Sequence, residues 1–201
     1  ETKSHAEELN IILADFRTFI TERNLVPVSN NRLLINPCGA SYEMNVAHNL
    51  YSDQPNRSKE FCKYLGLYKE KTVSRIGEVQ SIVEAKLTKD DLVIVETHPL
   101  PWKHNQTVEL DENQKTRVRE ALKQLAQGQK DTGTSRFYLV ERFVETNFAK
   151  TSKHGIFGHR YFTLDSKSTG NPSDELIPDL FHTHTPSLES IAAALAEKTW
   201  A

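Results

Sequence analysis

The chain lacks several features that mark large classes of protein. No apolar run approaches the roughly 20 residues of a membrane helix, and the first residues carry no signal-peptide pattern. The 2 cysteines, Cys38 and Cys62, have no CxxC spacing, so two free thiols are expected, with a disulfide as the open alternative. These absences predict a soluble cytoplasmic protein with no membrane association.

Motifs for nucleotide hydrolysis and nucleophilic catalysis are missing as well. The sequence has no Walker A loop, no Gly-x-Gly-x-x-Gly and no Gly-x-Ser-x-Gly. An excess of one charge is also absent, since 25 basic and 27 acidic residues leave a net charge of −2. Nucleic-acid binding would therefore depend on a local basic patch. The residues that could form it are Arg57, Lys59, Lys63, Lys103, Arg117, Arg119 and Lys123.

The spacing of apolar residues predicts an α+β fold. Helices are expected at 4–23 and 111–127, and Asp111 is placed to cap the second. Gly77 lies inside a long strand and predicts a bulge or a close backbone approach. Hairpin-type turns favour a mostly antiparallel sheet or a small β-barrel with flanking helices. The strands are expected at 32–35, 64–68, 72–87, 92–95 (compact and buried), 136–144 and 158–164.

The composition changes near residue 165. Residues 166–201 begin with a stretch rich in serine, threonine and proline, and they end in an Ala-rich helix at 187–198. We therefore predict a single domain at 1–165, followed by a linker-like extension. The weak apolar stripe of the last helix could dock on the domain or on a protein partner.

One catalytic pattern occurs in the long strand. Glu84 and Lys86 are two residues apart, so they share a face, and they resemble the second half of the PD-(D/E)xK nuclease motif. A nuclease of this kind would bind Mg²⁺ through Glu84 and an upstream acid such as Asp53. The competing interpretation is a solvent-facing strand with alternating charges. No other cofactor is expected, and the pairs His154/His159 and His182/His184 are interpreted as solvated.

Aromatic and polar side chains near turns provide a second pattern. Trp102 lies in a polar loop, where it either folds back onto the core or contacts a ligand. Aromatic faces stack on bases, while amide and basic groups bind base edges and phosphates. The predicted ligand-binding residues are therefore Trp102, Tyr42, Tyr51, Asn45, Arg57, Lys103 and His104.

The order of strands resembles a known superfamily. The segment 64–85, which contains Ile76-Gly77-Glu78-Val79, and the later segments 136–140 and 160–164 resemble the barrel strands of PUA-like domains. That superfamily includes the ASCH, EVE, YTH and SRA modules, and the resemblance covers roughly residues 30–165. It implies a small β-barrel with outer helices that binds DNA or RNA, in several members through a flipped modified base. Prokaryotic modules of this kind often accompany nucleases or antiviral defence effectors.

These observations lead to three hypotheses. The first is a non-catalytic nucleic-acid-binding module that recognises a modified or flipped base, within a prokaryotic defence or nucleic-acid-processing system. The second is the metal-dependent nuclease that uses Asp53, Glu84 and Lys86. The third is a protein-interaction domain whose contact surface is the helix at 187–198.

Overall fold

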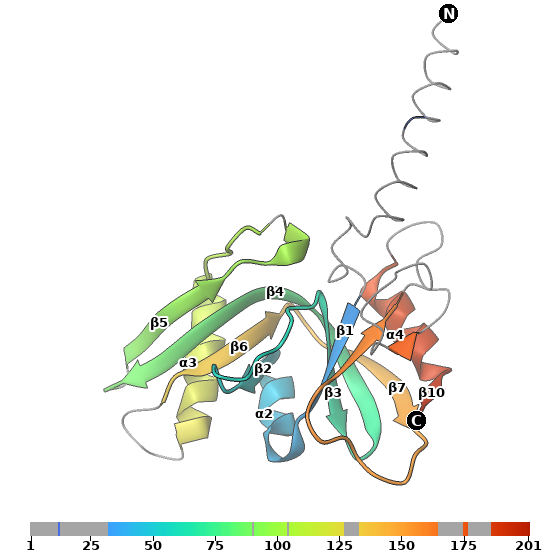
Figure 1. Ribbon diagram of the computed structural model, residues 1–201. Coiled ribbons are helices and arrows are strands. Elements are labelled where there is room, and N and C mark those ends of the chain that lie inside the picture. The colour runs from blue at the N-terminus through green and yellow to red at the C-terminus, as the bar shows by residue number, and fades with distance from the viewer. Residues whose placement is uncertain are drawn as a thin grey trace, which may run out of the picture.

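The computed structural model describes residue 12 and residues 32–89, 91–103, 105–126, 133–164, 175–176 and 186–201. It confirms the α+β class, with a mostly antiparallel, open mixed sheet (Figure 1). The predicted helix at 4–23, apart from Ile12, lies outside the described residues, as do His182 and His184. None of the described helices is long and apolar enough to cross a membrane.

The long strand β4 (Thr72–Thr88) is central to the fold. Its first half pairs with β3 (Tyr64–Lys69) and β7 (Val144–Lys150) in a group of strands that we call sheet A. Its second half pairs with β5 (Asp91–His98) and β6 (Ser135–Val140) in a second group, sheet B. Figure 1 shows β4 curving from one sheet into the other.

Gly77 marks the position where β4 passes between the sheets. A Cβ atom there would lie 2.7 Å from Cγ1 of Val140 on β6, closer than side chains pack. The close approach predicted from the sequence is therefore confirmed. Only glycine lets the two strands come this close while β4 bends.

The remaining strands extend the two sheets. In sheet A, β1 (Arg32–Pro37) runs parallel to β3 and antiparallel to β8 (Arg160–Thr163). The outer strands are β9 (Glu175–Leu176) beside β8, β10 (Thr199–Trp200) beside β7, and, in sheet B, β2 (Leu50–Asp53) beside β6.

The helices cover the outer faces of the sheets. α3 (Glu112–Ala126) lies against sheet B, where Val118 and Leu122 pack on β4 and β6. It begins with the predicted Asp111 cap: Asp111 Oδ1 accepts from the Gln114 backbone N–H at 2.7 Å. α4 (Leu188–Ala196) packs on sheet A. The short helices are η2 (Gly39–Ser41), α2 (Tyr42–Ala47) and η3 (Pro101–Lys103).

Alternating side chains divide the core into layers. On β1, Leu33 and Ile35 point outward to the cluster under α4, whereas Leu34 points inward to a cluster shared by both sheets. On β4, Val83 and Ala85 face α3, whereas Ile82 belongs to the shared inner cluster. The inner faces of sheets A and B therefore pack against each other.

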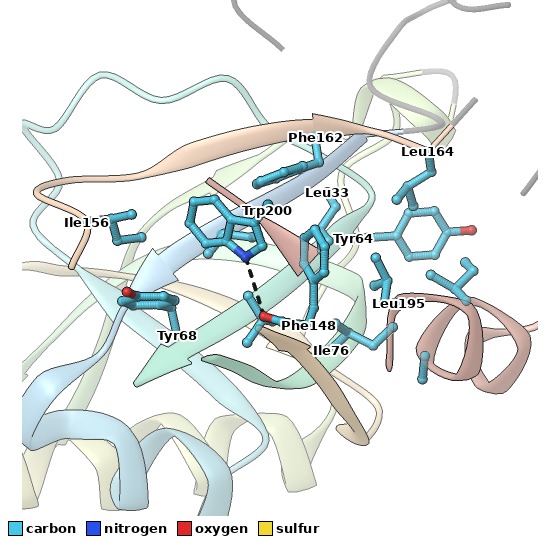
Figure 2. Close-up of a cluster of buried hydrophobic side chains, with 14 residues drawn as sticks. Leu33, Tyr64, Tyr68, Ile76, Phe148, Ile156, Phe162, Leu164, Leu195 and Trp200 are labelled. Carbon is cyan, nitrogen blue, oxygen red and sulfur yellow. Dashed lines mark hydrogen bonds between the residues drawn. The ribbon is translucent and has the colours of Figure 1, made fainter. Parts of the chain in front are cut away.

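The C-terminal segment is part of the outer core. Ile191 and Leu195 of α4 are fully buried, and the indole of Trp200 packs among Phe148, Phe162 and Tyr68 (Figure 2). The described part of the predicted extension therefore docks on the domain, which was one of the two alternatives for its helix.

Three local expectations differ from the structure. The strand at 92–95 was expected to be buried, but β5 is longer and lies at the sheet edge, so Val93 and Val95 are exposed. The strand at 136–144 ends at Val140, and β7 starts anew at Val144 because the chain passes there from sheet B to sheet A. α2 and β2 were not predicted, since their apolar residues follow no regular spacing.

Candidate functional site: a polar network beside a pocket

A row of polar side chains crosses the inner face of sheet B. Asp53 on β2 is directly opposite Arg136 on β6, which in turn is opposite Glu84 on β4. Residues opposite each other in a sheet project from the same face, so the three side chains lie side by side. The segment 54–63, between β2 and β3, crosses this face. The ring centroid of Phe61 lies 5.1 Å from that of His98 and 6.2 Å from that of Tyr138.

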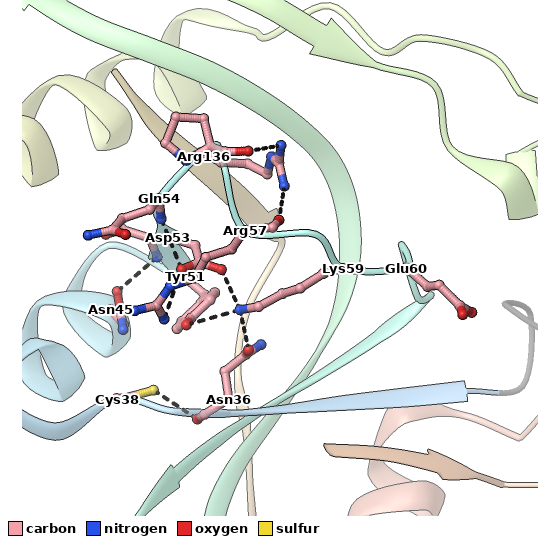
Figure 3. A network of polar contacts seen from close by, with 12 residues as sticks. Asn36, Cys38, Asn45, Tyr51, Asp53, Gln54, Arg57, Lys59, Glu60 and Arg136 are labelled. Carbon is pink, nitrogen blue, oxygen red and sulfur yellow. Dashed lines mark hydrogen bonds and ion pairs between the residues drawn. The ribbon is translucent and has the colours of Figure 1, made fainter. Parts of the chain in front are cut away.

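Lys59 and Asp53 form a buried ion pair at the centre of the network (Figure 3). Their side chains are only 2 % and 3 % exposed. The Lys59 ammonium also donates to Asn36 Oδ1 at 2.7 Å and to the Tyr51 hydroxyl at 3.4 Å. Arg57, which is half exposed, approaches Asp53 Oδ1 to 3.5 Å. Lys59, expected in a surface patch, thus lies inside the protein because Asp53 compensates its charge.

Arg136 joins the segment after β2 to sheet B. Its guanidinium donates to Glu84 Oε1 at 2.9 and 3.1 Å, and to the backbone carbonyls of Pro55 and Arg57 at 2.5 and 3.1 Å. These bonds hold the segment 54–58 against the sheet. They also fix the position from which Arg57 and Lys59 project.

A pocket of about 460 Å³ opens beside Lys59. This volume is within the range of small-molecule sites. Phe157 stands at its rim with 91 % of its surface exposed. The pocket is lined by Asn36, Pro37, Tyr51, Arg57, Ser58, Lys59, Ile156, Phe157, Gly158 and His159.

Burial changes the acid–base behaviour of the site. It lowers the pKa of the Lys59 ammonium, although Asp53 opposes this shift. Burial also lowers the pKa of His159, and the Lys59 charge lowers it further, so His159 is neutral at neutral pH. The pKa of Tyr51 is raised by burial, so its hydroxyl stays protonated.

The structure brings together two of the predicted ligand-binding residues. Tyr51 and Arg57 both line the pocket. Trp102 instead folds back and packs against the inner cluster, and Lys103 donates to Gln80 Oε1 at 3.2 Å; neither residue lines the pocket.

The other predicted ligand-binding residues have structural contacts or are undescribed. The hydroxyls of Tyr42 and Ser74 share a hydrogen bond of 2.5 Å. Asn45 is fully buried, and its Oδ1 accepts from the Ser52 backbone N–H at 3.3 Å. His104 lies outside the described residues.

The predicted catalytic acids both have protein cations as neighbours. Asp53 pairs with Lys59, and Glu84 pairs with Arg136. Lys86 projects from the same face of β4 as Glu84, as the alternation predicts. Glu84 also belongs to a group with Glu96 and His98 whose ligand atoms lie within 4.8 Å of one another, a spacing that could hold a divalent ion. Both His98 nitrogens contact carboxylates in this group, Glu84 at 3.2 Å and Glu96 at 3.4 Å.

Asn36 and Phe157 are among the pocket residues that were not identified as ligand-binding from the sequence. Asn36 stands between Ile35 and Pro37 at the end of an apolar strand, and a lone amide in that position is a signal for a buried polar role. Phe157 lies between Gly155 and Gly158 in a polar loop, and an aromatic residue in a polar loop is the same signal that Trp102 gives.

Comparison of the chain with models of known protein families, with curated proteins and with solved structures found no match.

Proposed function

We propose that this protein binds nucleic acid by taking an unpaired or flipped base into the pocket beside Lys59. The observation that carries the proposal is the combination of an exposed aromatic ring, Phe157, with the half-exposed basic side chain of Arg57 at a cavity of about 460 Å³. Base–aromatic stacking contributes about 1–3 kcal/mol per base. Exposed Arg57 is placed to contact a phosphate, and the cavity is large enough for one base.

We also propose that the chain is related to PUA-like domains. Two sheets that share β4 and pack their inner faces together are compatible with an incompletely closed barrel, with α3 and α4 outside it. In that arrangement the pocket lies beside the segment that follows β2. A net charge of −2 predicts modest affinity and few phosphate contacts, so binding should weaken only slightly as salt is added.

Replacing Phe157 with alanine is expected to weaken binding of single-stranded DNA or RNA by roughly tenfold or more, because the stacking surface is lost. The measurement is a fluorescence-anisotropy titration with labelled single strands and duplexes, at low and at physiological salt. Val95→Ala, which removes an exposed apolar side chain from the edge strand β5, is the matched control and should bind like the unmodified protein. Unchanged affinity in Phe157→Ala would remove the pocket from the binding site.

Lower pH is expected to strengthen binding through His159. In the free protein its pKa is lowered by burial and by the charges of Lys59, Arg160 and Arg57, with Asp53 acting in the opposite direction. A bound phosphate would counter the basic charges and raise this pKa. The complex then takes up a proton, and affinity increases as pH falls through the window between the two values.

The titration uses oligo-dT, whose bases do not titrate in this range, between about pH 7.5 and 5.5. The affinity gain should be under tenfold and should disappear in His159→Gln. A gain that persists in this variant would assign the effect to another group.

The second candidate is a metal-dependent nuclease. The group Glu84, Glu96 and His98, with Lys86 on the same face of β4, favours it, and Mg²⁺ would be its cofactor. Strands recovered from the anisotropy samples, run on a gel after incubation with Mg²⁺, distinguish the two candidates. Cleavage that Glu84→Gln abolishes would support the nuclease, whereas intact strands support binding alone.

A further inference from the structure

A second pocket adjoins the one beside Lys59. It has a volume of about 340 Å³, and Pro37, Tyr51 and Arg57 line both pockets. Because three residues are shared, the two pockets lie side by side on the surface of the protein. Leu125, near the end of α3, lines only the second pocket. Each volume is within the range of small-molecule sites, so each pocket could hold a separate chemical group.

Arg57 is the shared residue whose side chain is free to contact a ligand. Its main chain is held, because its N–H donates to the Gln54 carbonyl at 3.2 Å and its carbonyl accepts from Arg136 at 3.1 Å. Its side chain is half exposed, and in the part of the chain that the structure describes its charged partner is Asp53, 3.5 Å away (Figure 3). A guanidinium carries five N–H donors, so most of them are left for a ligand. The backbone therefore fixes a free cationic group at the boundary of the two pockets.

Each pocket also has an exposed apolar side chain. Phe157 stands at the rim of the first with 91 % of its surface exposed, and Leu125 lines the second with 40 % exposed. Val118 and Leu122, which lie on the same helix as Leu125, are fully buried. An aromatic ring and an exposed leucine are both surfaces on which the flat face of a base can pack. Both pockets are therefore suited to a base.

The charges around the two pockets suit a phosphate group at their boundary. Among the described residues that line them, Asp53 is the one acid, and it forms the buried ion pair with Lys59. Arg57 therefore leaves the boundary with a net positive charge. A guanidinium binds two oxygens of one phosphate through parallel N–H groups, which an ammonium cannot do.

We infer that the protein binds two consecutive nucleotides of a single strand, with one base in each pocket and the linking phosphate on Arg57. This inference rests on the proposed function and extends its ligand from one base to a dinucleotide. In the ligand, two flat bases flank one anionic phosphate. In the site, two pockets with apolar side chains flank one free guanidinium. Two adjacent unpaired bases are a feature of single strands, so these should bind better than a duplex with one flipped base.

The experiment uses labelled single strands of about 12 nucleotides that are abasic except for thymine. One strand carries a single thymine, another two adjacent thymines, and a third two thymines separated by several abasic positions. All carry the same phosphates, so differences in affinity report on the bases. The adjacent pair should bind roughly fivefold or more tightly than the single thymine, at the lower end of what a base contact contributes. The separated pair should gain only about twofold, from the doubled number of binding positions.

Three variants make the test specific, and a thermal melt of each checks folding. Leu125→Ala should reduce the affinity for the adjacent pair to that for the separated pair and leave single-thymine binding unchanged, because the first pocket is intact. Val93→Ala is the matched control, since Val93 is 38 % exposed on β5, and it should keep the full advantage. Arg57→Gln should weaken binding of all three strands roughly tenfold, because each strand loses a charged phosphate contact.

The outcomes separate this inference from the proposed function. An advantage of the adjacent pair that disappears in Leu125→Ala supports it. Equal affinity for the adjacent and the separated pair overturns it while nucleic-acid binding stands. An advantage that persists in Leu125→Ala, or unchanged binding in Arg57→Gln, also overturns it, because the second base or the phosphate then lies elsewhere. No binding of any strand, ordinary DNA and RNA included, overturns the proposed function, and the inference falls with it.

Discussion

Replacing Asp53 with asparagine is expected to lower the free energy of unfolding by about 3–5 kcal/mol, because the substitution leaves the buried Lys59 ammonium without its counter-charge. Both side chains are almost fully buried, so water cannot replace the lost carboxylate. Chemical denaturation at neutral pH measures the loss. Lys59→Met added to Asp53→Asn should recover most of it, because a methionine of similar length removes the uncompensated charge.

The loss in Asp53→Asn should also shrink at high pH. Burial already lowers the pKa of Lys59 in the folded protein, and removing Asp53 takes away the main opposing interaction. Between the lowered folded value and the ordinary unfolded value, the unfolded chain binds more protons, so stability rises with pH. Unfolding measured at about pH 7 and about pH 9.5 should therefore show a smaller deficit at the higher value. An equal loss of stability at both pH values would mean that the uncompensated charge in Asp53→Asn is not that of Lys59.

Replacing Trp200 with alanine is expected to cost about 3–5 kcal/mol, the usual range for removing a large aromatic side chain from a core. The indole contacts the rings of Phe148, Phe162 and Tyr68, and its N–H donates to the Phe148 carbonyl at 3.4 Å (Figure 2). The cavity left behind would adjoin α4, sheet A and the loop that carries Ile156.

Two further variants make this test specific. Trp200→Phe keeps a ring in the site and should lose less than half as much stability, while Thr199→Ala, at the exposed neighbour, should change little. All are compared by denaturant midpoint. A loss below about 1 kcal/mol in Trp200→Ala would show that the C-terminal strand contributes little to folding.

Local patterns in the sequence predicted local structure well. The alternation in 72–87 predicted β4, the spacing of Val118 and Leu122 predicted α3, and Asp111 identified its first turn. Such features depend on residues a few positions apart, where strand and helix periodicity act directly. The class α+β follows from them.

The site depends on contacts between distant parts of the chain, and these leave no local pattern. Asn36, Lys59 and His159 meet because β1 pairs with both β3 and β8, and the sequence alone does not specify those pairings. Arg57 and Tyr51 were predicted from their chemistry and do line the pocket. Trp102 was predicted for the same reason, yet it packs onto the core, because an aromatic ring in a loop serves either purpose equally well.

Sharing β4 between the two sheets has a consequence for folding cooperativity. A sheet that shared no strand with its neighbour could unfold locally while the rest of the molecule stayed folded. Here β4 pairs with β3 and β7 in one half and with β5 and β6 in the other, so opening either sheet frees part of the same strand. The layers under α3 and α4 are thus thermodynamically linked through one continuous backbone, and slow amide exchange should extend through the middle of β4 without a break.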